Sequence, residues 1–529
     1  MMYSSTRAAA EAVEDAGVDL ITYVPGHPIT DLAEAVAGAK IAINEKVALE
    51  VALGRSASGG RSLVIVKNVG MNLLADPLVI SATMTIGAGL VVLVGDDIGP
   101  EGSQAEMDSR HYGPLSMLPL LDASDASSLY SSLIEAFTLS ERMRAPAIVR
   151  LTSGVIKSSE EKPPARRELP PPEGGFRREI WDLTARGRHQ RFYKRAFPIA
   201  CEASESSSLN RIVCDSNSSI GIIAAGRPAA LAAGLGYPVL ALGYAHPLPA
   251  NLIRSFLDRH ELVLVAEEPG PFIESRVQLR GGVYGRLTGD LSQGEVTLEG
   301  LRKALDRMET ACGSPPVAPS ASASSTLPVA PPSTPGLALP AYAPAASHGP
   351  PASKRPAALP SAEDEERALP GRRGICPDCP YLPLYKAITG IERMVAGDAG
   401  CSIMAVRDPP AVDMVYGLGS SIGVASGFAE KGIALIGDYA FSHSGLQGLI
   451  NALWQERPVL VVLLENERAA MTGGQMVPSL MPVLKALLPV RSIEMPAEEK
   501  AAREILLDEI SRPGIGLLAA RARCPRFQP

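Results

Sequence analysis

IALIGDYAFSHSGL, residues 433–446, places an acidic residue directly after an apolar run. The run predicts a buried parallel strand, so Asp438 falls at the carboxyl end of that strand, the edge at which α/β sheets bind ligands. Residues 459–464 predict the next strand, which brings Asn466 to the same edge. The sequence therefore predicts an α/β fold with mostly parallel sheets and a polar site where two strands end.

Asp438 and Asn466 are residue types that bind magnesium. A carboxylate, an amide oxygen and one backbone carbonyl, which we assign to Arg468, suit the octahedral oxygen shell of Mg²⁺, with phosphate oxygens completing it. Two ordinary turn residues after buried strands would give the same spacing. The residues around the pair are needed to choose between these interpretations.

The flanking residues are more specific. GDYAFSHSGL (437–446) and LENERAAMTGGQ (464–475) resemble the diphosphate-binding domain in the large (alpha) subunit of indolepyruvate ferredoxin oxidoreductases. NEKVALE (44–50), KNVGMN (67–72) and QAEMDSRH (104–111) resemble the pyrimidine-binding domain of the same subunit. The resemblance covers nearly the whole chain. It implies a thiamine diphosphate-binding fold made of several three-layer α/β/α domains.

The resemblance also implies the residues that bind thiamine diphosphate and its Mg²⁺. The magnesium ligands are expected to be Asp438, Asn466 and Arg468. The residues expected to contact the cofactor are Gly417, Gly419, Gly437, Asp438, Tyr439, Ala440, Asn466 and Met471.

Glu45 is the first candidate for catalysis. Thiamine enzymes use a carboxylate against N1′ of the aminopyrimidine, and the motif NEK at a predicted strand-to-helix junction resembles the place where they carry it. A helix N-terminal acid that interacts with the macrodipole is the alternative, and Glu50 is the second candidate. His443, beside the predicted diphosphate site, is expected to be a polar contact of the active site.

Four cysteines resemble the cluster ligands of the family. Cys376 and Cys379 belong to CPDCPY, which is similar to the CPGCPH signature, and Cys401 and Cys524 occupy matching later positions. Together they are expected to bind one [4Fe-4S] cluster, since such clusters take four Cys ligands. A structural zinc site or a redox dithiol remains open.

Two positions depart from the family pattern. Tyr381 stands where the family has His after the cysteine pair, and His27 lies in a PGHP loop where the family has a sequence like PGTP. An imidazole exchanges protons near neutral pH whereas a phenol with a pKa of about 10 does not, so these changes bear on substrate choice. A surface or capping role is the alternative for His27.

Composition restricts the class of protein. The chain has 529 residues, 46% of them hydrophobic, and a net charge of −7, which gives no electrostatic case for nucleic-acid binding. Neither a signal peptide nor an apolar run of membrane-spanning length is evident, so we expect a cytoplasmic protein without membrane contact. Seven cysteines, an odd number, do not describe a disulfide framework.

Composition and strand patterns divide the chain. We expect a pyrimidine-binding domain at 1–155 and a transketolase C-terminal-like α/β domain at 156–310. A disordered Pro/Ala/Ser-rich linker is expected at 311–370, because it cannot bury enough apolar surface to fold. The diphosphate-binding domain with the cysteine site follows at 371–529. The ferredoxin-like module usual in the family is not expected, because the sequence stops five residues after Cys524.

The resemblance implies oxidative decarboxylation of an aryl or related pyruvate, such as indolepyruvate, to acyl-CoA and CO₂ with reduction of ferredoxin. Expected partners are the 2-oxo acid, coenzyme A, ferredoxin and a smaller beta-type subunit, in a dimer or hetero-oligomer. A non-oxidative thiamine-dependent decarboxylase or carboligase is the alternative, and a non-catalytic assembly subunit is a third class.

Overall fold

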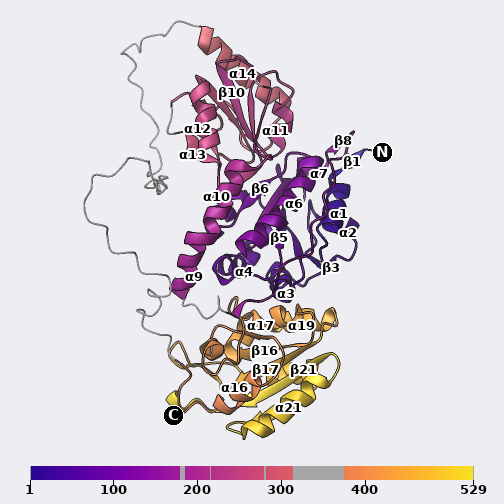
Figure 1. The fold of residues 1–529 in the computed structure, drawn as a ribbon, viewed down its shortest axis with the longest axis vertical. Coiled ribbons are helices and arrows are strands. Elements are labelled where there is room, and N and C mark those ends of the chain that lie inside the picture. Colours follow the sequence, from indigo (N-terminus) through magenta and orange to yellow (C-terminus); the bar gives the residue numbers. More distant parts are fainter. Residues whose placement is uncertain (1, 179–184, 215, 279–280, 314–373, 528–529) are drawn as a thin grey trace, which may run out of the picture.

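The computed structural model describes residues 2–178, 185–214, 216–278, 281–313 and 374–527. Three parallel or mostly parallel sheets, each flanked by helices, follow one another along the molecule (Figure 1). This confirms the predicted α/β fold class. Within the described ranges, no helix combines the length and the apolar character that a membrane span requires. The segment predicted to be a disordered linker, 311–370, lies outside the described residues from position 314 onward.

The first sheet is built from the N-terminal region. Its order is β12-β6-β7-β5-β4-β2-β3, and all neighbours are parallel except β12 with β6. Its strands are β2 (Leu20–Tyr23), β3 (Lys40–Ile41), β4 (Ser62–Lys67), β5 (Leu90–Asp96), β6 (Leu120–Asp122), β7 (Ala147–Thr152) and β12 (Tyr244–His246). The helices of this region are α1 (Ser5–Asp15), α2 (Thr30–Ala35), α3 (Glu45–Ala57), α4 (Met71–Met84), α5 (Tyr112–Ser116), α6 (Ala126–Met143) and α7 (Ser153–Ile156). A separate ribbon pairs β1 (Tyr3–Ser4) with β8 (Ser159–Glu160).

The second sheet has the order β14-β13-β10-β11-β9, with only β9 antiparallel. Its strands are β9 (Arg211–Val213), β10 (Ile220–Ala225), β11 (Val239–Leu242), β13 (Leu262–Ala266) and β14 (Val283–Tyr284). The helices around it are α11 (Arg227–Ala232), α12 (Ala250–Arg259), α13 (Glu274–Val277) and α14 (Leu298–Gly313). Helices α9 (Ala185–Arg191) and α10 (Phe197–Ser206) lie along the first region, against α4 and α6 (Figure 1).

Buried polar contacts join the first two sheets. After β13, Glu267 is fully buried, and its carboxylate accepts a hydrogen bond from Arg110 at 2.5 Å. Arg150 on β7, which pairs with two acids inside the first sheet, also donates to the Glu268 carbonyl at 2.9 Å. Removing one partner of such a pair would leave a buried charge uncompensated, so these contacts hold the regions in one arrangement.

The third sheet is wholly parallel, with the order β15-β16-β17-β21-β20. Its strands are β15 (Val395–Gly397), β16 (Gly432–Gly437), β17 (Val459–Glu465), β20 (Arg491–Glu494) and β21 (Ile515–Arg521), and a ribbon pairs β18 (Arg468–Ala469) with β19 (Gln475–Met476). The helices are α16 (Leu382–Thr389), α17 (Ser421–Ser426), α18 (Asp438–Ala440), α19 (Leu446–Trp454), α20 (Met481–Leu487) and α21 (Glu499–Ser511).

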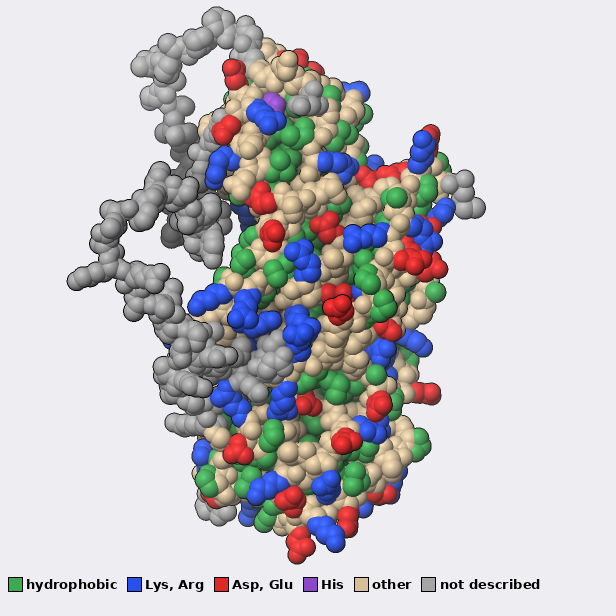
Figure 2. Space-filling view, viewed as in Figure 1, with side chains coloured by type: hydrophobic (Ala, Val, Ile, Leu, Met, Phe, Trp, Pro, Cys, Tyr) green, Lys and Arg blue, Asp and Glu red, His purple; other side chains and the backbone are tan. Residues whose placement is uncertain are grey.

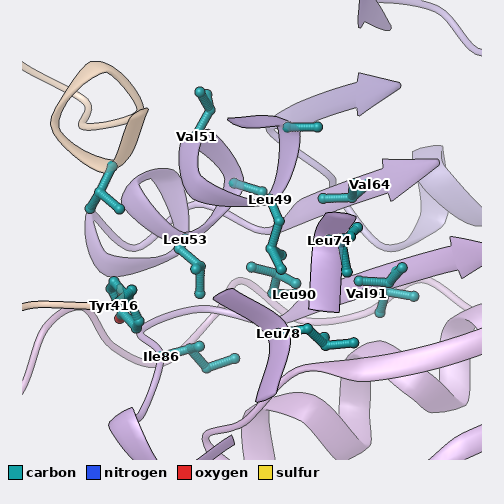
Figure 3. Packing of buried hydrophobic residues seen from close by; sticks show 14 of the residues in the cluster. Leu49, Val51, Leu53, Val64, Leu74, Leu78, Ile86, Leu90, Val91 and Tyr416 are labelled. Atoms are coloured by element: carbon teal, nitrogen blue, oxygen red, sulfur yellow. The ribbon is translucent and has the colours of Figure 1, made fainter. Parts of the chain in front are cut away.

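Helix α3 connects the first region to the third. Almost every residue of α3 is buried, and the helix packs against α17, with Leu49 and Leu53 on the side of the first sheet (Figure 3). Gly54 allows the close approach, because a Cβ there would lie 1.9 Å from the carbonyl oxygen of Val424. The Tyr416 hydroxyl donates to the Thr85 carbonyl at 2.8 Å across the same junction. One continuous hydrophobic core therefore spans the first and third sheets.

The surface carries both charge signs. On the face shown in Figure 2, acidic and basic side chains are interspersed over the region of the third sheet.

Candidate active site

Asp438 and Asn466 meet at the carboxyl ends of β16 and β17, as the strand pattern predicts. Oδ2 of Asp438 accepts the backbone N–H of Asn466 at 2.9 Å and that of Glu467 at 2.5 Å, and Oδ1 accepts the N–H of Tyr439 at 2.8 Å. Burial raises the pKa of Asp438, while these N–H groups lower it. Three backbone N–H groups therefore fix the orientation of the Asp438 carboxylate.

The turn after β17 directs the second oxygen donor. Glu467 adopts a φ of 57°, uncommon for a residue other than glycine, and its N–H points at Asp438. The amide oxygen of Asn466 accepts the N–H of Arg468 at 2.9 Å, and the Arg468 carbonyl accepts the N–H of Ala470 at 2.9 Å. Each of these oxygens has a second lone pair. The set of a carboxylate, an amide oxygen and a carbonyl fits the chemistry of Mg²⁺.

A cavity of about 440 Å³ opens over these residues. The predicted cofactor residues that line it are Gly437, Asp438, Tyr439, Ala440, Asn466 and Met471, and the predicted magnesium ligand Arg468 lines it as well. Gly417 and Gly419 flank Leu418, which lines the cavity in their place. His443 lies outside the lining, with its exposed ring 3.2 Å from the Ser444 hydroxyl.

Asp398 is a site residue that the sequence reasoning missed. It follows β15, is fully buried, and accepts the N–H of Gly419 at 2.6 Å and of Ser421 at 3.1 Å. Burial raises its pKa to about 7. Its carboxylate holds the loop that presents Leu418 to the cavity. The signal that located Asp438, an acid at a strand end, was also present here.

Glu45 begins α3 and is half-buried. Asn44 caps the helix by accepting the N–H of Val47 at 2.9 Å, and its side-chain amide donates to Gln447 of α19 at 2.8 Å. The Glu45 carboxylate lies directly against Gly70, where a Cβ would be 2.4 Å from Oε1. The motifs at 44–50 and 67–72 therefore meet at this carboxylate, next to the third region.

Glu50, the second candidate, belongs to a buried charge network. Its Oε1 lies 3.1 Å from Nζ of Lys46, and Lys46 also contacts Asp76. Burial raises the pKa of Glu50 to about 8, opposed by Lys46 and reinforced by Asp398. A Cβ on Gly417 would lie 3.4 Å from Asp76, so the network reaches the loop that carries Leu418. Glu50 is only 1% exposed, which favours Glu45 as the carboxylate that a cofactor can reach.

The four predicted cysteines converge. Cys376 and Cys379 lie before α16, Cys401 follows β15 and Cys524 follows β21, and all four line one cavity of about 170 Å³ as free thiols. Burial, together with the three other thiols, raises the pKa of Cys401 to about 11. Within the part of the chain that the structure describes, no group of three His, Cys, Asp or Glu residues is arranged around a single ion. Four thiols that line one cavity are the ligand type and number that a [4Fe-4S] cluster takes.

The two departures from the family pattern lie in different places. Tyr381 is 2% exposed, lines the cysteine cavity, and donates its hydroxyl to the Glu465 carbonyl at 3.0 Å. His27 is partly exposed, with Nε2 3.5 Å from Asp97 and 3.8 Å from Glu101.

Known proteins are similar to this chain in sequence. The family described as "Thiamine pyrophosphate enzyme, C-terminal TPP binding domain" matches residues 398–486, which include Asp438 and Asn466. Indolepyruvate oxidoreductase subunit IorA of Methanothermobacter thermautotrophicus is 31% identical over 515 residues, covering 89% of this chain and 76% of the relative. The chain belongs to the IorA family. The IorA subunit of Archaeoglobus fulgidus is 29% identical, with 88% and 75% covered. The chain is therefore a thiamine pyrophosphate-dependent oxidoreductase subunit, which confirms the resemblance.

A solved structure shares the fold along the whole chain. A protein from Mycobacterium smegmatis, described as a thiamin diphosphate-dependent enzyme, superposes with a TM-score of 0.50 at 13% identity, over 99% of this chain and 100% of the other. At this identity the match concerns the fold alone, and it confirms the predicted thiamine diphosphate-binding architecture.

Proposed function

We propose that the chain is the thiamine diphosphate-binding subunit of a 2-oxoacid:ferredoxin oxidoreductase that acts on an aryl pyruvate of the indolepyruvate type. The observation that carries this proposal is that two cavities share a wall. Cys401, Asn466, Ala470 and Met471 line both the cavity over Asp438 and the cavity of the four cysteines. To oxidise a substrate bound to thiamine diphosphate, the enzyme needs an electron acceptor close to the cofactor. The shared residues place the cysteine cavity next to the cavity over Asp438.

Each group of residues has a separate task in this proposal. When bound, thiamine diphosphate supplies the electron sink that lets a 2-oxo acid lose CO₂. Asp438, Asn466 and the Arg468 carbonyl hold Mg²⁺ against the diphosphate. Glu45 holds a proton at the aminopyrimidine ring.

The cysteine site is the part of the proposal that makes the decarboxylation oxidative. Cys376, Cys379, Cys401 and Cys524 would hold a [4Fe-4S] cluster, which would supply one-electron transfer toward ferredoxin. The remaining acyl group goes to coenzyme A. Indolepyruvate is proposed because the relatives carry the name indolepyruvate oxidoreductase subunit. The word subunit in that name supports an assembly with another chain, which we propose to be a smaller beta-type subunit in a dimer or hetero-oligomer.

The domain roles follow from the same assignment. We propose that 1–155 binds the pyrimidine and 371–529 the diphosphate, with 156–310 as a transketolase C-terminal-like unit that supports assembly. Strand β12, the ion pair of Glu267 with Arg110 and the hydrogen bond from Arg150 to the Glu268 carbonyl tie 156–310 to the first sheet, which favours a structural role for that unit.

Product analysis tests the proposed function. The chain, purified without oxygen together with its smaller subunit, is incubated with indolepyruvate, coenzyme A and ferredoxin. Acyl-CoA with reduced ferredoxin is the expected result. Free aldehyde or acyloin without ferredoxin reduction would instead establish the non-oxidative decarboxylase or carboligase, and no product from any 2-oxo acid would indicate an assembly subunit.

A further inference from the structure

Tyr385 presents an unused hydrogen-bond donor beside the cysteine cavity. The residue lies on α16, and its ring lines the cavity together with the four cysteines. Tyr385 is fully buried, and its hydroxyl has no hydrogen-bond partner among the described residues. A buried hydroxyl without a partner has given up its hydrogen bonds to water for nothing in return, so such a group calls for an explanation.

The hydroxyl of Tyr385 differs from that of its neighbour Tyr381 in having no hydrogen-bond partner in the portion that the structure describes. Tyr381, one turn earlier, lines the same cavity, but its hydroxyl is used by the Glu465 carbonyl. Both side chains present an aromatic ring to the cysteines, and only Tyr385 of the two retains a free O–H there. Hydrophobic packing explains the ring of Tyr385, and it does not explain its hydroxyl.

The cavity offers sulfur acceptors to this hydroxyl. Cys376, Cys379, Cys401 and Cys524 line it together with Tyr385. A phenol with a pKa of about 10 is protonated at neutral pH, so the Tyr385 hydroxyl is available as a donor. The sulfur atoms of a cluster held by these cysteines would lie in the same cavity.

We infer that the Tyr385 hydroxyl donates a hydrogen bond to a sulfur atom of the cluster that the four cysteines hold, and thereby sets its reduction potential. This inference rests on the cluster of the proposed function and adds a positioning residue to it. Hydrogen bonds to the sulfurs are one of the factors that set such potentials. The reduced cluster carries more negative charge, so a donor stabilises it and raises the potential.

The test is a redox titration of three proteins: wild type, Tyr385→Phe and Tyr381→Phe. The absorption spectrum of the cluster reports its oxidation state at each potential. We expect Tyr385→Phe to retain its iron and to shift to a more negative potential by about tenfold in the one-electron equilibrium, or about 59 mV. Tyr381→Phe keeps the ring environment and loses a hydroxyl that is engaged elsewhere, so its potential should stay near that of wild type. Equal potentials for wild type and Tyr385→Phe would overturn the inference. Wild-type protein without iron and sulfide would overturn the cluster assignment itself, and the two failures are thereby distinguished.

A second measurement tests the inference if Tyr385→Phe loses its iron and cannot be titrated. The Fe–S stretching bands of wild-type protein are recorded after prolonged exchange in deuterated buffer, and the same is done for Tyr381→Phe. A deuterium shift present in both proteins supports an O–H bonded to sulfur from Tyr385. Bands that do not move in the wild type would overturn the inference.

Discussion

The carboxylate of Asp438 accepts the backbone N–H of Asn466 at 2.9 Å, so the two oxygen donors of the predicted magnesium site are linked across neighbouring strands. β16 and β17 are parallel and in register up to Gly437 and Leu464, which places both residues on one edge. The same edge carries Cys401 after β15 and Cys524 after β21. One sheet therefore positions the ligands of the cofactor and of the proposed cluster.

Glu45→Gln isolates the proposed catalytic carboxylate. The variant keeps the size of the side chain beside Gly70 but cannot hold a proton at the pyrimidine, so cofactor should still bind. We expect exchange of the C2 proton of bound thiamine diphosphate to slow by about 10²-fold or more, the usual cost of lost acid-base assistance. Proton exchange followed by NMR measures this.

Gly70→Ala tests whether the position of the Glu45 carboxylate matters. The added methyl group would overlap the Glu45 carboxylate, so this variant should also slow C2 exchange while leaving Glu45 chemically intact. Wild-type exchange rates in Glu45→Gln would move the role elsewhere, with Glu50 as the next candidate.

Cys401→Ser separates electron transfer from decarboxylation. Wild-type protein purified without oxygen should contain about four irons per chain and absorb broadly near 400 nm, as one Cys₄-ligated cluster does. The variant should lose the cluster and ferredoxin reduction, yet still release CO₂ from a 2-oxo acid, because that step needs only the thiamine site. Iron analysis, gas release and ferredoxin reduction are the three measurements.

Cys201→Ser is the matched control for this experiment. Cys201 lies on α10, away from the cysteine cavity, and should leave the iron content unchanged. Zinc in place of iron in the wild-type protein, together with free aldehyde as product, would contradict the oxidoreductase assignment.

Glu50 makes stability depend on pH. Its pKa is raised by burial from a model-peptide value of 4.5 to about 8, so the folded protein holds a proton there that the unfolded chain releases. The stability that this proton gives is fully present below pH 4.5 and is lost as the pH rises through about 8. Relative to wild type, the Tm of Glu50→Gln should therefore rise as the pH increases from 5 to 8.

The control for the pH experiment is Glu299→Gln. Glu299 is an exposed acid paired with Lys303, and its pKa is lowered, so it stays ionised throughout this range. Its Tm difference from wild type should be the same at pH 5 and pH 8. A difference for Glu50→Gln that is equally constant would show that Glu50 is ionised in the folded protein.

The strand ends could be predicted from the sequence because each apolar run stops at a polar residue. Residues 433–436 and 459–464 lie within β16 and β17, and Asp438 and Asn466 meet where the pattern placed them. The convergence of Cys376, Cys379, Cys401 and Cys524 was implied by the family resemblance and is present in the structure as one cavity. Their role as cluster ligands stays a prediction.

Other features depend on contacts between distant elements. The burial of Glu50 arises from the packing of α3 against α17, and that of Tyr385 arises beside the cysteine loops. Strand β12 is only three residues long, too short for a recognisable pattern, although it joins the first sheet. Such features follow from tertiary packing, which local residue patterns do not encode.

Calorimetric titration of thiamine diphosphate and Mg²⁺ into wild type and Asp438→Ala tests the central claim most directly. The substitution removes the anionic ligand that faces the diphosphate-bound metal, and it leaves the apolar strand β16 intact. We predict clear binding to the wild type, undetectable binding to Asp438→Ala, and the same folded spectrum for both. Unchanged affinity in Asp438→Ala would contradict the assignment of Asp438 and Asn466 as the magnesium and diphosphate site.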